Sequence, residues 1–165
     1  MDNAFLGLGS NINNKSQNLI NALKELSNHT KIVKISSVYR SQSLLKDHQE
    51  DYFNITIKIQ LTHDPQNLLS LIKNIESKLG RIDVGFWRER LIDIDILDFN
   101  NKVLKFNNLS IPHPEMVKRT FVLYPLKEIE PEYIHPILQC NIDDIIKNIN
   151  DDLNITKIGR LNWQL

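Results

Sequence analysis

The sequence predicts one α+β domain in which an antiparallel sheet is covered by helices in the order β-α-β-β-α-β, the split βαβ arrangement. Three observations support this prediction. Residues 52–61 (YFNITIKIQL) alternate as a half-buried strand does. Residues 65–79 carry an apolar stripe at helical spacing, and residues 92–99 (IDIDILDF) alternate again.

The first half of the chain supplies four elements. Residues 3–9 are a short apolar run, and residues 16–27 form an amphipathic helix with apolar positions at Leu19, Ile20, Leu23 and Leu26. Residues 31–39 are rich in β-branched side chains. A polar loop at 41–51 then leads into the strand 52–61.

The second predicted helix has clear start and stop signals. Asp64 is a suitable N-cap, Pro65 suits the first helical position, and Gly80 is placed to end the helix. Its apolar stripe consists of Leu68, Leu69, Ile72, Ile75 and Leu79. After a loop at 81–90 comes the last strand, and both helices would cover the same face of the sheet.

Residues 100–165 extend the chain beyond this core. Their pattern predicts a hairpin or loop, a turn at Pro112-His113-Pro114, a helix near 119–129 and a short helix at 142–149. The chain has 165 residues, so the whole of 1–165 is expected to form a single domain.

The charge and cysteine content of the chain indicate which kinds of binding partner to expect. The chain has 20 basic and 20 acidic side chains, which gives no electrostatic footprint for nucleic acid or a membrane surface. The lone Cys140 cannot form an internal disulfide, and the first ten residues lack signal-peptide features. We therefore expect a cytoplasmic monomer that binds small molecules.

Two aspartates interrupt the apolar strand at 92–99. Asp93 and Asp95 share one face because side chains alternate along a strand, and two adjacent like charges must be offset by a cation or by water. On strand 52–61, Tyr52, Asn54 and Thr56 would also point away from the predicted helices, to a sheet face that we expect to carry no helix. A solvated sheet face is the commoner reason for such a pattern. A planar ligand beside a metal ion is the functional alternative.

Basic residues gather nearby in the sequence. They are Arg81, Arg88, Arg90, Lys118 and Arg119, with His113 held between two prolines. Such residues are often ordinary surface charge, but beside a carboxylate pair they suit a polyphosphate, because arginine binds phosphate oxygens in a bidentate manner. The chain has no P-loop, and Gly7-Leu8-Gly9 lacks the third glycine of a dinucleotide motif.

Seven segments of the chain form a recognisable set: LGLGSN (6–11), SSVYRS (36–41), DYFN (51–54), GRID (80–83), WRERLIDIDILDF (87–99), SIPHPEM (110–116) and KRTFVLYPLKEI (118–129). Their most specific part is the W-x-x-R-x-x-D-x-D run followed by P-H-P and R-x-F. Together, from about residue 4 to 136, these segments resemble the 6-hydroxymethyl-7,8-dihydropterin pyrophosphokinase family.

The resemblance implies a ferredoxin-like fold and transfer of pyrophosphate from ATP to the pterin hydroxymethyl group, releasing AMP, in folate biosynthesis. It also implies two Mg²⁺ ions held by Asp93 and Asp95. Arg81 and Arg90 would grip the transferring phosphates. The nucleotide would be bound by Ser110, His113 and Arg119, with its adenosine part near Glu76 and Ile96.

The resemblance also implies a pterin site. Tyr52 and Phe121 would stack on the two faces of the pterin, and Asn54 would read its polar edge. Trp87 would close over the ligand, and residues near Ser41 and Leu44 would add backbone contacts. A non-catalytic nucleotide- or metabolite-binding module on the same fold is the alternative. A module that only binds has no need to place aspartates and arginines around a triphosphate.

Overall fold

The computed structural model describes residues 1–42, 50–80, 91–150 and 154–163. The core elements are β1 (Asp2–Ser10), α1 (Lys15–Ser27), β2 (Lys31–Ile35), β3 (Val38–Ser41), β4 (Tyr52–Leu61), α2 (Pro65–Lys78) and β5 (Asp93–Phe99). The remaining elements are β6 (Leu104–Lys105), β7 (Ser110–Ile111), a 3₁₀ turn (Met116–Lys118), α3 (Thr120–Ile129), α4 (Ile142–Asn148) and β8 (Ile155–Gly159).

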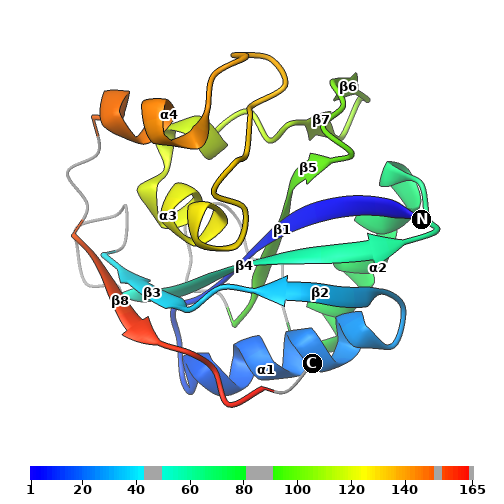
Figure 1. The fold of residues 1–165 in the computed structure, drawn as a ribbon. Helices are drawn as coiled ribbons and strands as arrows, with labels where there is room; N and C mark the ends of the chain where they lie inside the picture. The colour runs from blue at the N-terminus through cyan, green and yellow to red at the C-terminus, as the bar shows by residue number, and fades with distance from the viewer. Residues whose placement is uncertain (43–49, 81–90, 151–153, 164–165) are drawn as a thin grey trace.

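The main sheet is antiparallel and runs in the order β5-β1-β4-β3-β8, while β2 pairs with the same side of β4 as β3 does (Figure 1). The predicted strand at 31–39 is therefore two strands, which separate at Ser36 and Ser37. Of the hairpin or loop predicted after residue 100, the structure has the hairpin, formed by the β6–β7 pair. The predicted order β-α-β-β-α-β is present.

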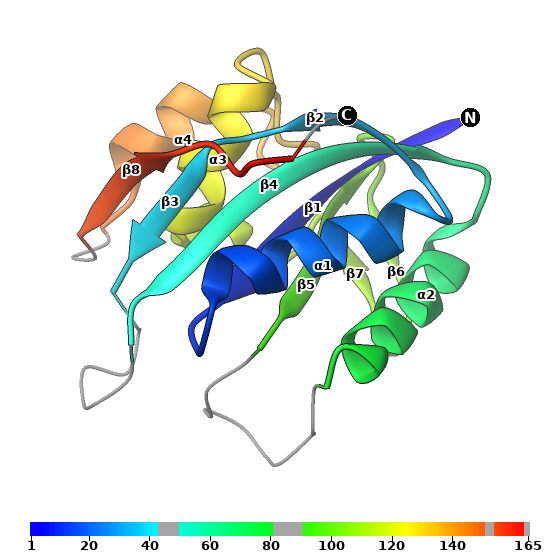
Figure 2. The same ribbon diagram turned by 90° about the horizontal axis from the view of Figure 1, so that it is seen from below.

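Helices α1 and α2 lie on one face of the sheet, as predicted (Figure 2). The Asn14 and Asp64 side chains cap their first turns by accepting hydrogen bonds from Gln17 and Asn67 backbone N–H groups. Their apolar stripes pack against alternate residues of the strands. The largest fully buried side chains of this core include Leu6, Leu8, Leu19, Leu23, Ile55, Ile57, Leu68 and Ile72.

The expectation that the opposite face carries no helix is wrong. There α3 packs on the sheet and α4 packs on α3 (Figures 1 and 2). A second apolar cluster fills this layer, formed by Phe5, Leu97, Met116, Val122, Leu123, Leu126, Ile129, Tyr133, Ile142 and Ile145. Because part of this face is a packed core, the open part near Asp93 and Asp95 is a more restricted surface than alternation alone predicts.

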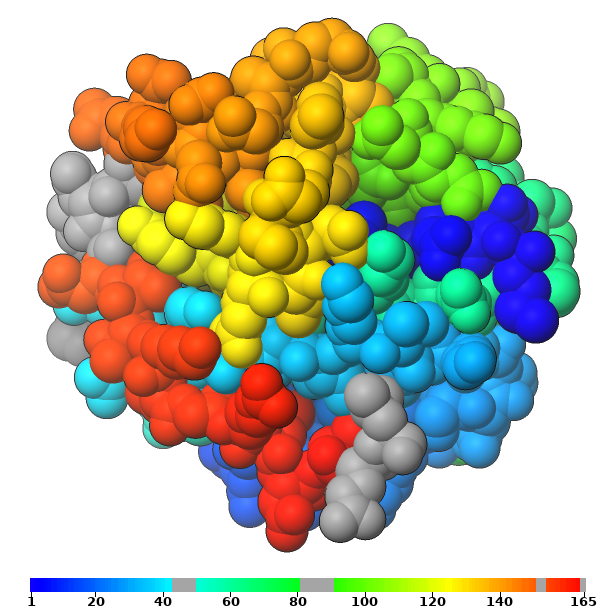
Figure 3. All heavy atoms as spheres, in the orientation of Figure 1, coloured from blue at the N-terminus to red at the C-terminus, as the bar shows by residue number. Residues whose placement is uncertain are grey.

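The C-terminal segment adds a strand that the sequence did not predict. β8 pairs with β3 and extends the sheet, and in Figure 3 its red surface borders the yellow surface of α3. Leu161 and Trp163 then pack against the main core. Among the described helices, none is long and apolar enough to span a membrane.

Candidate active site

The register of three strands builds the floor of the site. Asp93 lies opposite Gly9 and Asp95 opposite Gly7 on β1, while Gly9 also lies opposite Asn54 on β4. Because the neighbouring residues Ile94 and Leu8 belong to the core under α1 and α2, these side chains point to the α3 side of the sheet. The prediction that Asp93, Asp95 and Asn54 share one face is confirmed.

Asp95 lies beside two nitrogen groups from outside the strand. Its Oδ2 atom is 3.7 Å from Arg119 Nη1 and 3.9 Å from His113 Nε2. Both distances exceed those of ordinary hydrogen bonds, so the Arg119 contact is an ion pair without a hydrogen bond, and the His113 ring is a close neighbour of the carboxylate. The Asp95 side chain is 36% exposed. Solvent therefore screens its charge, and a ligand can reach the carboxylate.

His113 is held by the backbone on both sides of the turn that follows β7. Its backbone N–H donates to the Leu97 carbonyl at 2.9 Å, and its ring atom Nδ1 accepts from the Glu115 backbone N–H at 3.1 Å. Acceptance at Nδ1 leaves Nε2, the nitrogen facing Asp95, to carry the proton of the neutral ring. Burial lowers the pKa of His113, and the Asp95 carboxylate offsets only part of that effect.

The start of α3 supplies the other cationic group. Arg119 is the N-cap of α3 in an extended conformation, and its guanidinium carbon is 5.9 Å from the centre of the Phe121 ring. The two side chains are therefore neighbours, as a cation beside an aromatic face. Both project from the end of α3 that lies nearest Asp95.

Asn54 is oriented by its own neighbours. It is only 5% exposed, and its Nδ2 donates to Ser41 Oγ at 2.8 Å and to the Tyr39 carbonyl at 3.3 Å. Within the described chain its Oδ1 accepts no hydrogen bond and lies over Gly9, where an added Cβ would be 3.2 Å away. Tyr52 Cδ1 would be 3.6 Å from the same point. Glycine thus leaves space for an amide and an aromatic ring on one side of the floor.

Glu76 and Ile96 lie apart from this face. Glu76 is 5% exposed, and its Oε1 accepts a 2.8 Å hydrogen bond from the Ile94 N–H at the outer edge of β5. The Ile96 side chain lies in the core beneath α1 and α2. Any contact of Ile96 with a ligand on the aspartate face would therefore involve its backbone. Ser110 is half-buried in β7, paired with Lys105.

Four predicted site residues, Leu44, Arg81, Trp87 and Arg90, lie outside the described residues. Among the residues that are described, no group of three or more His, Cys, Asp or Glu side chains converges on a metal-sized site. The donor set at Asp93 and Asp95 still suits Mg²⁺, because this ion commonly takes one or two carboxylates and completes its shell with water and substrate phosphates.

An antiparallel α+β domain with a carboxylate pair, an arginine and a histidine on one sheet face fits the class of phosphate-transferring enzymes. Residues 5–131 match the family model of 7,8-dihydro-6-hydroxymethylpterin-pyrophosphokinase. The chain belongs to this family, and its activity is pyrophosphate transfer in folate biosynthesis. The family assignment predicted from the sequence is confirmed.

Two relatives of known name align with most of the chain. The chain is 40% identical over 137 residues to the 2-amino-4-hydroxy-6-hydroxymethyldihydropteridine pyrophosphokinase of Aquifex aeolicus, covering 83% of this chain and 86% of the relative. The enzyme of the same name from Haemophilus influenzae is 37% identical over 153 residues, with 92% and 95% coverage.

A solved structure of Plasmodium falciparum HPPK-DHPS, wild type with SDX-DHP, superposes with a TM-score of 0.69 at 22% identity. The match covers 89% of this chain and 43% of that one, so this chain corresponds to less than half of the larger protein. At this identity the similarity concerns the fold, and the predicted ferredoxin-like α+β fold is confirmed.

Sequence reasoning missed two parts of the site. Gly7 and Gly9 were noted only as an incomplete nucleotide motif, although Gly9 makes room for Asn54. Glu128 was not singled out, although it bonds Ser37 and Tyr39 directly behind the site. Only the quoted segments SSVYRS and KRTFVLYPLKEI contained a signal for these contacts.

Proposed function

We propose that the chain transfers the pyrophosphoryl group of ATP to 6-hydroxymethyl-7,8-dihydropterin with the aid of two Mg²⁺ ions. The pterin hydroxyl oxygen forms a bond to the β-phosphorus, the bond from that phosphorus to the α,β-bridging oxygen breaks, and AMP leaves. The hydroxyl proton is released. The products are the pterin diphosphate and AMP.

One observation carries this proposal: Asp95 lies within 4 Å of both Arg119 and His113, on the same sheet face as the oriented Asn54 amide. Asp93 and Asp95 would hold the metal ions, which neutralise charge on the triphosphate and at the reacting phosphorus. Arg119 and the Nε2–H of His113 are suited to the nucleotide phosphates, with Arg81 and Arg90 proposed for the transferring group.

The pterin would lie on the Gly9 side of the floor. Asn54 Oδ1 can accept a hydrogen bond from a donor on the polar edge of the pterin, because both hydrogens of its amide are used by Ser41 and Tyr39. Tyr52 and Phe121 are proposed to stack on the ring. Leu44 and Trp87 would add the contacts that the family resemblance implies.

For the adenosine part we propose the outer edge of β5, where Glu76 accepts from the Ile94 N–H and Ile96 follows two residues later, with Ser110 on the neighbouring hairpin. We further propose that the enzyme acts as a monomer in the cytoplasm. All candidate residues belong to one chain, and the lone Cys140 offers no internal disulfide that would require an oxidising compartment.

The test is to incubate the chain with ATP, Mg²⁺ and the hydroxymethyl dihydropterin, and to separate the nucleotides. We expect AMP and pterin diphosphate in equal amounts, with no AMP when the pterin or Mg²⁺ is omitted. Formation of ADP would show ordinary phosphoryl transfer, and pterin-independent AMP would show hydrolysis. Either result would contradict the proposal. Asp143→Asn, at a half-exposed site on α4, is a control that should retain activity.

A further inference from the structure

One helix connects the candidate pterin site to a polar network behind it. Phe121 lies in the first turn of α3, and Glu128 lies seven residues later, which is two helical turns along the same side. Helix α3 packs on β4 and β3, the strands that carry Asn54 and Ser41. The position of α3 therefore sets the distance between Phe121 and the Asn54 amide.

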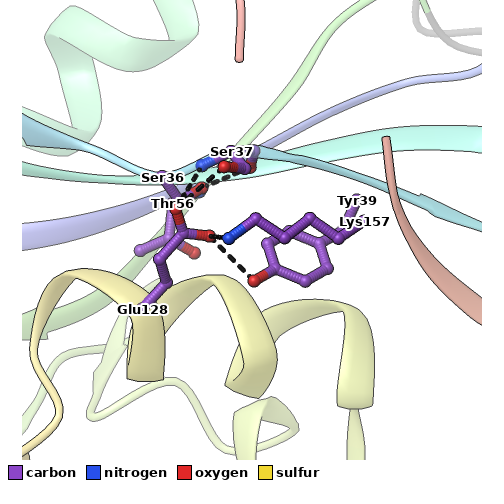
Figure 4. A network of polar contacts seen from close by, with 6 residues as sticks. All are labelled: Ser36, Ser37, Tyr39, Thr56, Glu128 and Lys157. Carbon is purple, nitrogen blue, oxygen red and sulfur yellow. Dashed lines mark hydrogen bonds and ion pairs between the residues drawn. The ribbon is translucent and has the colours of Figure 1, made fainter. Parts of the chain in front are cut away.

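Both carboxylate oxygens of Glu128 contact residues of the facing strands and of the β2–β3 bend, namely Ser37, Tyr39 and Lys157 (Figure 4). Oε1 accepts hydrogen bonds from the Ser37 N–H at 3.1 Å and the Ser37 hydroxyl at 2.8 Å. Oε2 accepts from the Tyr39 hydroxyl at 2.8 Å and lies 3.4 Å from Lys157 Nζ on β8. Glu128 therefore connects α3 to the β2–β3 bend, to β3 and to β8.

The carboxylate is charged in this environment. Burial raises the pKa of Glu128, but the hydrogen bonds from Tyr39 and Ser37 outweigh that effect and bring the pKa below its ordinary value. Burial, with Glu128 as a further cause, raises the pKa of Tyr39, so the phenol stays protonated as the donor. Hydrogen bonds to an ionised acceptor are roughly twice as strong as neutral ones, and the Glu128 side chain is only 18% exposed.

The strand that Glu128 holds also orients Asn54. The Tyr39 carbonyl accepts from Asn54 Nδ2 at 3.3 Å, and Ser41, two residues further along β3, accepts from the same nitrogen at 2.8 Å. A polar path thus runs from the Glu128 carboxylate through Tyr39 to the Asn54 amide.

A separate anchor holds the end of α3 on the sheet. Lys34 Nζ donates to the Ile129 carbonyl at 2.7 Å, and Lys58 Nζ donates to Glu130 at 2.8 Å. The apolar face of α3 is buried as well. Loss of the Glu128 carboxylate should therefore leave α3 folded and packed on the sheet, but the distance between α3 and β3 would no longer be fixed.

We infer that Glu128 is a positioning residue for pterin recognition, which holds α3 and β3 at the separation that places Phe121 and Asn54 around the pterin ring. This inference rests on the proposed function of the site. Of the residues proposed to bind the nucleotide, Arg119 also lies at the start of α3, but Asp95 and His113 are held on β5 and by the Leu97 carbonyl, so the nucleotide side depends less on Glu128.

The experiment compares Glu128→Ala, Glu128→Gln and Lys157→Met with the unaltered chain, by calorimetric titration well below the unfolding temperature. One titration uses the hydroxymethyl dihydropterin, and the other uses a non-hydrolysable ATP analogue with Mg²⁺. For Glu128→Ala we expect pterin affinity to fall about tenfold, equivalent to about 1.4 kcal/mol. We expect the affinity for the ATP analogue to change by less than about threefold.

The other two variants are the matched controls. In Glu128→Gln the amide oxygen can still accept from Ser37 and the amide nitrogen can donate to the Tyr39 hydroxyl, so pterin affinity should stay within about threefold of the original. Lys157 is 53% exposed, so Lys157→Met removes a screened ion pair and should leave both affinities nearly unchanged.

Unchanged pterin affinity in Glu128→Ala, or equal losses for pterin and ATP analogue, would overturn the inference. If Glu128→Ala does not fold, Tyr39→Phe takes its place, since it keeps the Ser37 contacts and removes only the strand-to-helix hydrogen bond. It should weaken pterin binding selectively by about fivefold, the cost of one such bond, and no effect would refute the role. Failure of the unaltered chain to bind the pterin would instead refute the proposed function.

Discussion

Replacement of Gly9 by alanine tests whether Gly9 leaves the space in which the Asn54 amide binds the pterin. An alanine Cβ at this position would lie 3.2 Å from Asn54 Oδ1 and 3.6 Å from Tyr52 Cδ1. The first distance is shorter than most contacts of a real Cβ, so the Asn54 amide must retreat by a few tenths of an ångström. It would retreat against its 2.8 Å hydrogen bond to Ser41.

The expected magnitudes follow from this geometry. Removing a glycine from a strand stabilises the fold by about 0.4–1 kcal/mol through the unfolded chain. An off-rotamer asparagine costs about 0.5–1.5 kcal/mol, so the two effects nearly cancel and the unfolding temperature should change little. Pterin affinity should fall about fivefold, which is the value of one impaired hydrogen bond of about 1 kcal/mol.

Gly7→Ala is the matched control on the same strand and the same face. Its Cβ would meet Leu97 Cδ2 at 3.4 Å, an ordinary contact with the end of a flexible side chain. We expect Gly7→Ala to be as stable as the original chain or slightly more so, with unchanged pterin affinity in calorimetric titration. Equal pterin affinity in Gly9→Ala and Gly7→Ala would refute the assignment of Asn54 to the ligand.

Three further changes have defined outcomes. Asp95→Asn should lower AMP formation at saturating Mg²⁺ by about 100-fold or more. The melting temperature of the free protein should change little, because solvent screens the contact between Asp95 and Arg119. Near-normal turnover would refute the metal role of Asp95. Thr56→Val should match or exceed the original stability in chemical denaturation, because the buried Thr56 hydroxyl has no hydrogen-bond partner among the described residues. Burial lowers the pKa of His135, so the unfolded chain takes up this proton first as the pH falls below about 6.5. The unfolding free energy should therefore drop between pH 7 and 5, and less so in His135→Asn.

Alternation along the strands was sufficient to predict the two sheet faces. It placed Asp93, Asp95 and Asn54 together because a period of two is set by backbone geometry and is insensitive to distant contacts. It could not predict that α3 covers part of their face. The apolar stripe of residues 120–129 shows that the helix is buried, but it does not identify the surface on which the helix lies.

Asp98 shows a different limit. Strict alternation would send its carboxylate into the core with Ile94 and Ile96. Instead, the register of β5 shifts opposite Phe5 and Leu6, and the bulge turns Asp98 to the α3 side, where Tyr133 donates to it at 2.9 Å. A bulge depends on how two strands meet, and neither strand's own sequence contains that information.

The short strand β8 was missed for a related reason. Residues 155–159 (ITKIG) are mostly exposed, so they carry little of the apolar pattern that identifies a strand. Their stability comes from pairing with β3 and from contacts such as that between Lys157 and Glu128, which join residues far apart in the chain.

Asp95 shows how one set of side chains can serve the site with and without substrate. In the free protein, Arg119 and the Nε2–H of His113 lie 3.7 and 3.9 Å from Asp95 Oδ2, close enough to offset its charge but too far for strong hydrogen bonds. In the proposed complex, the Asp95 carboxylate would bind a metal ion, and the two nitrogen groups would turn to phosphate oxygens. The charges of Asp95 and Arg119 would each exchange one partner for another, and the neutral His113 would redirect its N–H, so little electrostatic stabilisation of the free enzyme is lost when ATP binds.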